Sequence, residues 1–240
     1  MPPKAKQQGP RRRTDKSRFD SRLLFVLGAG VLVGVVAVVL SLTLGHSSST
    51  SSSDVKVDLS AVAGIPQNGL VLGNPNAKVT VTEYVDMTCP ICREYTLTIF
   101  PSIAKRYVRP GNVKIQMRPI NNGWPSGARG RDLVLAAAQQ NKAWQFSDAL
   151  YQNQGEETQA WLTDDLARAV AAKIPGLVDS KLFADATSAA VQAQAEKANS
   201  EAQADGVGGT PTLIVTTKTG TREGVSPGNL ATALDQALAG

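Results

Sequence analysis

The chain has 240 residues, of which 42% are hydrophobic and 19% charged, and its formal net charge is +5. Positions 1–22 hold eight Lys or Arg against two acidic residues, a local charge of +6 that leaves −1 for the rest. Because the basic excess belongs to a short terminal segment, it argues against a nucleic-acid-binding domain, and the length allows one sizeable domain plus extra segments.

Residues 23–44 form an uncharged apolar run directly after the basic segment. A helix of this length spans about 33 Å, enough for the roughly 30 Å hydrocarbon core of a membrane. Basic residues flank only its N-terminal side, which predicts a cytoplasmic tail at 1–22, a transmembrane anchor at 23–44 and an extracytoplasmic remainder. The alternative is a cleaved signal peptide, whose apolar region should be shorter and end in a small-x-small site.

Residues 45–57 are rich in Ser and Thr and predict a solvated linker that keeps a domain at 58–240 close to the membrane. His46, the only histidine of the chain, lies in this linker, where we expect it to be exposed to solvent. Any proton acceptor in the domain is therefore a carboxylate, water or a sulfur.

After a mixed stretch with a short strand near 69–72 and a turn at 74–77, the β-branched run Val79–Val85 predicts a strand. Glu83 shares one face of this strand with three valines, so burial should raise the pKa of its carboxyl. We expect Glu83 to lie under the next helix and to accept the Cys92 proton, the alternative being a contact with solvent or a basic neighbour. Asp86 is expected to be a solvated or capping residue.

Cys89 and Cys92, the only cysteines, follow this strand and precede a predicted helix that ends near Val108. A strand that leads into a helix through Cys-x-x-Cys is typical of thioredoxin-like redox sites. If Cys89 is the N-cap and Pro90 the first helical residue, unpaired backbone donors and the helix dipole lower the pKa of Cys89. Cys89 is then the nucleophile that attacks a disulfide sulfur, and Cys92 resolves the mixed disulfide.

Two other interpretations of the cysteine pair are weaker. A zinc site needs about four ligands, and the sequence offers two cysteines and a distant His46, so we expect no metal. A purely structural disulfide would close too short a loop to add much stability.

The remaining sequence alternates helical and strand patterns. Gly111–Arg118 predicts a half-exposed strand, followed by a loop at 119–130 and by helical segments near 126–153, 162–173 and 177–204, with a break at Pro175-Gly176. Four aromatic residues of this region are expected in the core rather than in a peptide groove: Trp144, Phe146, Trp161 and Phe183. A hairpin of Thr212–Thr217 and Thr221–Val225 precedes a helix at 230–238 that residues 226–229 cap. This order predicts an α/β layered domain with a large helical insertion at about 126–205.

Residues 70–240 resemble the DsbA-like thiol:disulfide oxidoreductases of the thioredoxin superfamily. Four motifs carry the resemblance: residues 73–77 (Gly-Asn-Pro-Asn-Ala), the approach from Glu83 to Asp86, residues 89–93 (Cys-Pro-Ile-Cys-Arg), and residues 207–212 (Val-Gly-Gly-Thr-Pro-Thr). The resemblance implies a thioredoxin-like α/β fold with an inserted helical domain. It also implies that Cys89 is the attacking cysteine, that Cys92 is buried, and that Glu83 is the family's buried acidic residue.

The same resemblance implies a cis Thr210-Pro211 peptide bond opposite the dithiol, which keeps metals off the sulfurs. The exposed Thr210 backbone would then pair with an extended substrate segment, much as an edge strand does. We expect the substrate to contact Thr210, Pro211, Pro90 and Ile91. An ordinary loop that leads into a strand is the alternative for residues 208–211.

Ile91 departs from the best-known member of the family, whose cysteines enclose a histidine. Ile91 has no charge and donates no hydrogen bond, so it stabilises the Cys89 thiolate less. The couple is therefore expected to be less oxidising than in that member, and Ile91→His should raise the reduction potential.

These features predict a monomeric, cofactor-free enzyme that oxidises thiols of exported proteins and is reoxidised by a membrane partner. The direction of the reaction is open, because a reductase or isomerase would carry the same two cysteines. No dimerisation segment of the kind usual in isomerases is evident between residues 45 and 70. A membrane-anchored binding or chaperone module without catalysis is the alternative from another class.

Overall fold

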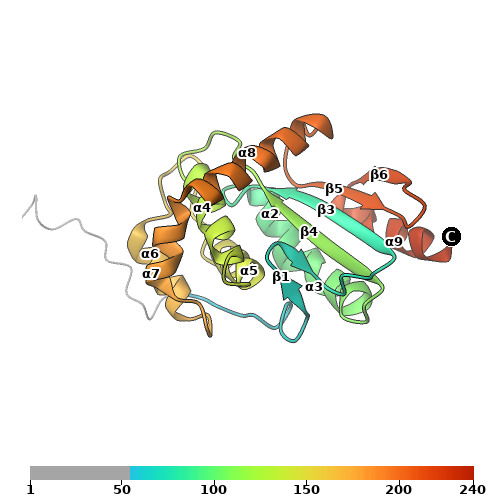
Figure 1. The fold of residues 1–240 in the computed structure, drawn as a ribbon, viewed down its shortest axis with the longest axis horizontal. Coiled ribbons are helices and arrows are strands. Elements are labelled where there is room, and N and C mark those ends of the chain that lie inside the picture. The colour runs from blue at the N-terminus through green and yellow to red at the C-terminus, as the bar shows by residue number, and fades with distance from the viewer. Residues whose placement is uncertain (1–54) are drawn as a thin grey trace, which may run out of the picture. The chain divides into compact units, whose positions relative to one another are not determined.

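The computed structural model describes residues 55–240, and the predicted tail, the predicted anchor and most of the predicted linker lie outside the described residues. Its centre is a six-stranded sheet in the order β1-β2-β4-β3-β5-β6 (Figure 1). The strands are β1 (Gln67–Asn68), β2 (Val71–Leu72), β3 (Val79–Val85), β4 (Val113–Pro119), β5 (Thr212–Thr216) and β6 (Arg222–Val225). Strands β3 and β4 are parallel, and the other neighbours are antiparallel. Within residues 55–240, no helix is both long enough and apolar enough to cross a membrane.

The sheet has one apolar face and one largely polar face, because its central strands alternate in sequence. In β4 every second residue is buried from Val113 to Pro119, and the residues between them are half-buried. In β3 the predicted face of Val79, Val81, Glu83 and Val85 is entirely buried. The expected half-exposed strand and the shared face of Glu83 are therefore confirmed.

The active-site helix is one continuous helical segment from Pro90 to Val108 that contains two wider turns. It consists of α2 (Pro90–Glu94), the π-helical η1 (Tyr95–Ile99), α3 (Phe100–Ile103) and the π-helical η2 (Ala104–Val108). Pro101 has no N–H to bond into the preceding turn, which accounts for the wider turn beside it. The predicted helix is confirmed, with Cys89 as the N-cap and Pro90 as the first helical residue.

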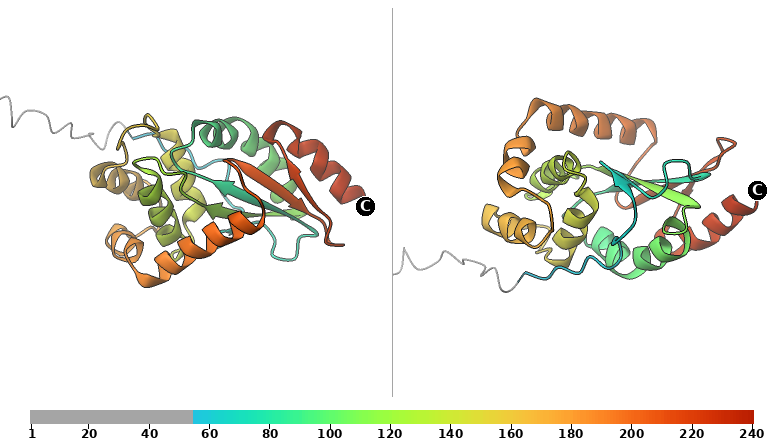
Figure 2. Two further views of the ribbon diagram at one scale, coloured as in Figure 1. Left: turned by 90° about the horizontal axis from the view of Figure 1, so that it is seen from above. Right: turned by 60° about the horizontal axis from the view of Figure 1, so that its bottom comes forward.

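Five helices form the insertion between β4 and β5: α4 (Gly127–Ala138), α5 (Ala143–Gln152), α6 (Asp164–Ala172), α7 (Asp179–Ala186) and α8 (Ala189–Ala204). Two predicted helices are each broken in two. The first break lies at residues 139–142, where Asn141 has a positive φ of 55°. The second precedes α8, whose N-cap Ser188 accepts a hydrogen bond from Val191 N. Figure 2 shows these helices beside one end of the sheet, with α9 (Leu230–Ala239) at the other.

The main core lies on the apolar face of the sheet and continues into the insertion. It contains both cysteines, and it also contains Trp144 and Phe146. The ring of Phe100 stacks on Trp144 with centroids 5.6 Å apart. Trp161 and Phe183 are half-buried and pack against this core. These four aromatic residues thus serve core packing, as expected.

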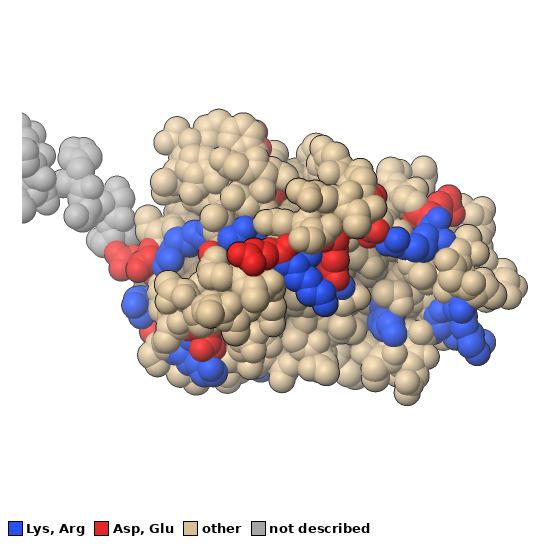
Figure 3. Space-filling model, turned by 45° about the horizontal axis from the view of Figure 1, so that its top comes forward, with Lys and Arg blue, Asp and Glu red and all other residues tan. Residues whose placement is uncertain are grey.

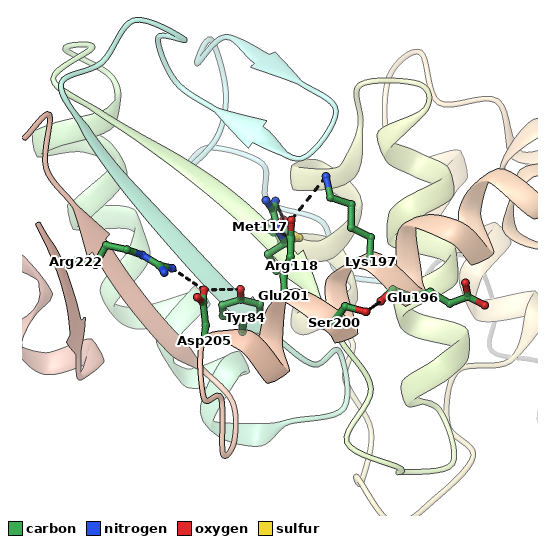
Figure 4. A network of polar contacts seen from close by, with 9 residues as sticks. All are labelled: Tyr84, Met117, Arg118, Glu196, Lys197, Ser200, Glu201, Asp205 and Arg222. Atoms are coloured by element: carbon green, nitrogen blue, oxygen red, sulfur yellow. Dashed lines mark hydrogen bonds and ion pairs between the residues drawn. The ribbon is translucent and has the colours of Figure 1, made fainter. Parts of the chain in front are cut away.

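The polar face of the sheet is covered by α8 through a small apolar cluster and a network of ion pairs. The cluster holds Tyr84, Ile120, Ala198, Ala202 and Ile214. At the end of α8, Asp205 accepts hydrogen bonds from the Tyr84 hydroxyl at 2.8 Å and from Arg222 at 2.7 Å (Figure 4). Arg118 pairs with Glu201 in the same network. The face drawn in Figure 3 accordingly carries basic and acidic side chains next to each other rather than a patch of one sign.

The first described residues pack on the insertion. Val55 is buried, and Lys56 exchanges two backbone hydrogen bonds with the Asn153 side chain, at 2.9 and 2.6 Å. Gln152 holds the backbone of Asp58 in the same way, with both distances 2.7 Å. Residues 55–57, which we expected in the linker, therefore belong to the folded domain.

The C-terminal hairpin and helix follow the prediction with one difference. Gly220 has a φ of 87° in the turn between β5 and β6, a conformation that favours glycine. The expected cap of the last helix is instead a 3₁₀ turn, η3 (Pro227–Asn229), in which neither Ser226 nor Asn229 makes a side-chain capping bond.

Candidate active site

Cys89 is the N-cap residue of the active-site helix, as the sequence predicts. Its backbone is extended, with φ −71° and ψ 120°, and Pro90 occupies the first helical position. The Cys92 backbone N–H donates to the Cys89 sulfur at 3.2 Å. The sulfur therefore takes the place that an oxygen occupies in an ordinary N-cap, next to the unpaired donors of the first turn.

The surroundings of Cys89 favour its thiolate. Hydrogen bonds from the Cys92 thiol, the Thr210 side chain and the first backbone N–H groups of the helix lower the pKa of Cys89 to about 6, although burial opposes the shift. The Thr210 carbonyl accepts a hydrogen bond from the Cys89 thiol at 3.2 Å, a contact that favours the protonated form. The donors outweigh this single acceptor, so Cys89 is a substantially ionised nucleophile near neutral pH.

Cys92 has the opposite environment one turn further along the helix. It is fully buried, and burial together with the neighbouring Cys89 raises the pKa of its thiol far above the ordinary value. Both cysteines are in the thiol form in this structure. Because Cys92 stays protonated, it needs a base when it attacks a mixed disulfide, and it needs a proton when it leaves.

Glu83 lies buried beneath the helix, with 3% of its surface exposed. Burial raises the pKa of its carboxyl to about 7, against a hydrogen bond of 3.1 Å that the Tyr95 hydroxyl donates. The predicted desolvation is confirmed, and no basic side chain reaches Glu83 among the interactions of the described residues. A carboxyl that exchanges its proton near pH 7 has the right acidity to serve Cys92.

The sequence predicts that Asp86 is either solvated or a capping residue; it is fully buried, and the structure shows the capping role. One oxygen accepts hydrogen bonds from the backbone N–H and the hydroxyl of Thr88, at 2.8 and 2.7 Å. The other oxygen accepts from the backbone N–H of Asn122 at 2.7 Å. Asp86 therefore caps the turn before Cys89, and these three donors compensate for the loss of water.

Asn122 joins the turn before the cysteines to the loop of Thr210. Its side-chain amide donates to the Thr210 hydroxyl at 2.8 Å, and its backbone N–H donates to Asp86. Cys89 completes a ring of hydrogen bonds with these residues. Its thiol donates to the Thr210 carbonyl, and its backbone N–H donates to the Asp86 carbonyl at 3.1 Å. These four residues come from three separate loops, and their bonds fix the Thr210 carbonyl against the reactive sulfur.

The insertion holds the other side of the active-site turn. Gln154 donates to the carbonyls of Met87 and Cys89, at 2.8 and 3.1 Å. The Tyr151 hydroxyl donates to the Asp86 carbonyl at 3.1 Å, and Arg93 donates to the Tyr151 carbonyl at 3.0 Å. The turn is thus clamped between the insertion and the loop of Thr210.

The predicted substrate-binding residues surround Cys89 at the surface. The Thr210-Pro211 peptide bond is cis, as the family resemblance implies, and the Thr210 backbone touches the Cys89 sulfur. Pro90 is exposed, and Ile91 exposes 59% of its surface. On the other side of Pro90 lies a cavity of about 350 Å³, which Arg93, Gln154 and a short acidic segment line. The structure therefore brings the predicted residues together around one sulfur.

Sequence reasoning missed Asn122 and Gln154. A signal was present for Asn122, because it follows β4 as Asp86 follows the parallel neighbour β3. The carboxyl ends of parallel strands meet at one edge of a sheet, which places these two residues together. Gln154 had no such signal, since its partners lie 65 or more residues away along the chain.

The geometry supports thiol–disulfide exchange. It pairs an acidic sulfur at the start of the helix, in a residue with 7% of its surface exposed, with a fully buried, protonated sulfur one helical turn away. A carboxyl of nearly neutral pKa bonds to Tyr95 of the same helix. A sulfur with a low pKa is both an available nucleophile and a good leaving group.

Comparisons with known proteins agree with this chemistry. Residues 66–236 match the family model described as Thioredoxin. The chain is 26% identical over 197 residues to the probable disulfide bond formation protein D of Bacillus cereus, covering 79% of this chain and 88% of that protein. It is 30% identical over 165 residues to the disulfide bond formation protein D of Bacillus subtilis, covering 66% and 73%.

Solved structures show the same fold. The oxidised BdbD of Bacillus subtilis matches with a TM-score of 0.63 and 22% identity, over 73% of this chain and 98% of that chain. A thioredoxin-like oxidoreductase from Silicibacter pomeroyi matches with a TM-score of 0.58 and 26% identity, over 77% and 99%. The expected thioredoxin-like fold with an inserted helical domain is confirmed.

Proposed function

This chain belongs to the thioredoxin family and is a protein disulfide oxidoreductase, and from that premise we propose that it oxidises the thiols of exported proteins outside the cytoplasm. The observation that carries the proposal is the low pKa of Cys89 at the start of its helix, beside a Cys92 that remains protonated. Stabilising the Cys89 thiolate stabilises the reduced protein, which makes its disulfide a better oxidant.

The reaction proceeds through one mixed disulfide. A substrate thiolate attacks the Cys89 sulfur of the oxidised protein, the Cys89–Cys92 bond breaks, and Cys92 leaves with the electron pair and takes a proton from Glu83. A second substrate thiolate attacks the substrate sulfur of the mixed disulfide, and Cys89 leaves as a thiolate. The substrate loses two electrons, the protein gains them, and a membrane redox partner reoxidises the dithiol.

The substrate lies across the Thr210 loop as an extended segment. The Thr210 backbone touches the Cys89 sulfur, so a chain that pairs with this backbone brings its own sulfur into line with Cys89. Pro90 and Ile91 offer apolar contact on the other side of the sulfur. Backbone pairing makes binding tolerant of sequence, as an enzyme with many protein substrates requires.

The location outside the cytoplasm is supported by the sequence of residues 1–44. The apolar run at 23–44 is proposed to be an uncleaved anchor with residues 1–22 in the cytoplasm, so that the domain acts as a monomer close to the membrane. Disulfides persist in that compartment, where an oxidase is useful.

A reduction potential measured against glutathione, together with oxidation of a reduced unfolded protein, tests the direction. An oxidase gives a potential well above that of thioredoxin, which is about −270 mV, and introduces disulfides in a stoichiometric reaction. A potential at or below that value would favour the second candidate, a reductase of the same compartment. Cys89→Ala should abolish exchange, and a binding module without catalysis would instead keep its function in this variant.

A further inference from the structure

Glu83, which we propose exchanges a proton with Cys92, is itself shielded from solvent. The carboxyl is buried on the apolar face of the sheet, and its hydrogen-bond partner Tyr95 is buried as well. Each catalytic cycle moves one proton from Glu83 to Cys92 and later one from Cys92 back to Glu83. Because the pKa of Glu83 is about 7, its carboxyl also gains and loses protons between these two steps, and those protons come from solvent.

A small cavity of about 10 Å³, with room for about one water molecule, adjoins Glu83, and neither cysteine lines it. Its polar lining consists of Glu83, Thr96, Ser147, Asp148 and Tyr151, and its remaining walls are aromatic or aliphatic. Asp148 comes from α5 in the insertion, whereas Glu83 comes from the sheet. The cavity is therefore the place where carboxyl groups from the two parts of the domain face a common space.

Asp148 is a buried carboxyl that the reaction described so far does not use. Only 5% of its surface is exposed, and no cation lines the cavity that it shares with Glu83. Burial raises the pKa of Asp148 to about 7, with a contribution from the negative charge of Asp58 and against a hydrogen bond with Gln152. Both carboxyls thus hold and release protons in the same pH range.

The outer side of Asp148 lies close to solvent. The negative charge of Asp58 acts on Asp148, and Asp58 is exposed to solvent. Two hydrogen bonds with the Gln152 side chain hold the backbone of Asp58 against the end of α5. Asp148 is slightly the more exposed of the two carboxyl residues, with 5% of its surface exposed against 3% for Glu83. The two carboxyls therefore follow each other from the dithiol to the surface, first Glu83 and then Asp148.

We propose that Asp148 is a positioning residue for proton exchange, which passes protons between Glu83 and solvent across the shared cavity. In each turnover Glu83 gives its proton to the departing Cys92, and Asp148 returns one to Glu83 from solvent. When Cys92 attacks a mixed disulfide, the proton moves in the opposite direction. This inference rests on the proposed role of Glu83 and extends it to the insertion.

The test isolates the Cys92 step in single turnover. The reduced protein reacts with an excess of a model disulfide peptide, acid stops the reaction, and mass spectrometry separates the mixed disulfide from the closed Cys89–Cys92 form. Asp148→Asn should slow closure about tenfold, less than the loss of a direct acid–base group, and should leave the first attack by Cys89 unchanged. Asp165→Asn, which removes an exposed carboxylate of α6, is the matched control and should close normally.

A double-mutant cycle distinguishes proton transfer from damage to the structure. If Asp148 acts only through Glu83, then Glu83→Gln with Asp148→Asn should close no more slowly than Glu83→Gln alone. Formate should also restore closure in Asp148→Ala, because a small acid replaces the missing carboxyl. Additive effects of the two substitutions, absence of rescue, or normal closure of Asp148→Asn would each overturn the proposal.

The same data separate this inference from the proposed function. Failure of the first attack in the unmodified protein would contradict thiol–disulfide exchange itself. Normal closure of Glu83→Gln would contradict the role of Glu83, and with it that of Asp148. Slow closure of Glu83→Gln with normal closure of Asp148→Asn would refute only the role of Asp148.

Discussion

Two tyrosine–carboxylate pairs lie on opposite faces of strand β3, and they differ in what surrounds them. Glu83 points to the apolar face and accepts a hydrogen bond from Tyr95 at 3.1 Å. Its neighbour Tyr84 points to the polar face and donates to Asp205 at 2.8 Å (Figure 4). The two hydrogen bonds are chemically alike, yet the pKa of Glu83 is raised and that of Asp205 is lowered.

The environment decides the direction of each shift. Burial dominates at Glu83, and the single hydrogen bond from Tyr95 is too weak to offset it. At Asp205 the hydrogen bond and charge of Arg222 dominate over partial burial. A carboxyl without a cation is thus ready to take a proton at neutral pH, whereas a carboxyl paired with arginine stays ionised and holds structure.

The largest difference between the two faces should appear in the rate of the Cys92 step. Glu83→Gln should slow closure of the mixed disulfide about a hundredfold, because it removes the acid–base group next to the buried thiol. Asp205→Asn, on the other face, should close at the normal rate. Single-turnover kinetics of both variants provide the comparison, and equal rates in the two would show that the buried pair has no role in catalysis.

The two carboxyls should also change stability in opposite pH ranges. In the folded protein the pKa of Glu83 is about 7, against an ordinary value of 4.5. The protonated Glu83 therefore contributes fully to folding stability below about pH 4.5, and this contribution is lost as the pH rises through 7. The loss amounts to about 3 kcal/mol of unfolding free energy. Urea titrations at a series of pH values from 4 to 8 measure this loss. The unfolding free energy of Glu83→Gln should fall by about 3 kcal/mol less over this range than that of the unmodified protein.

Asp205 supplies the reverse case for the same titrations. The pKa of Asp205 in the folded protein lies below its ordinary value of 3.8. Its contribution to folding stability is therefore present above pH 3.8 and is lost as the pH falls through the lowered pKa. Asp205→Asn should lower stability at neutral pH and leave the slope between pH 4.5 and 7 unchanged. A changed slope in that window would mean that the two faces are not independent.

Removal of each tyrosine hydroxyl sharpens the comparison further. Tyr95→Phe takes away the hydrogen-bond donor that lowers the pKa of Glu83, so this pKa should rise. In a plot of the closure rate against pH, the increase on the acid side should move to higher pH by about 0.7 unit, for a hydrogen bond of about 1 kcal/mol. Tyr84→Phe should cost about 1 kcal/mol of stability and leave this pH profile in place. A shift of the profile in Tyr84→Phe would contradict the separation of the faces.

The smallest effect is expected from a substitution of Ile91, an exposed residue that belongs to neither face of the sheet. Ile91→His places a partly charged ring near the Cys89 thiolate, and an interaction of about 0.5–1 kcal/mol raises the reduction potential by roughly 10–20 mV. The exposure of 59% at this position limits the effect, because water screens the charge. Equilibration with glutathione measures the change, and a potential that is unchanged or lower would refute this account of Ile91.

The parts of the fold that follow local rules could be predicted closely. Strand alternation sorted Glu83 to the buried face of β3, and the strand–Cys-x-x-Cys–helix order identified the reactive sulfur. The helical breaks near Asn141 and Ser188 were missed, because residues rich in Ala, Gln and Leu favour helix on both sides of each break. Tertiary packing sets where such a segment turns.

The sequence by itself pointed to the chemistry of this protein: which sulfur is the nucleophile and which carboxyl lies under its helix, while the family resemblance supplied the loop that faces the sulfur. Only the tertiary structure decided how that chemistry is held and connected, through the Asn122 ring, the Gln154 clamp, the burial of Asp86 and the cavity shared by Glu83 and Asp148. The physical reason is range. Helix caps and strand faces depend on neighbours within a few residues. The contacts between separate loops and elements named here join groups that are 36 to 121 positions apart, and these groups meet only when the chain is folded.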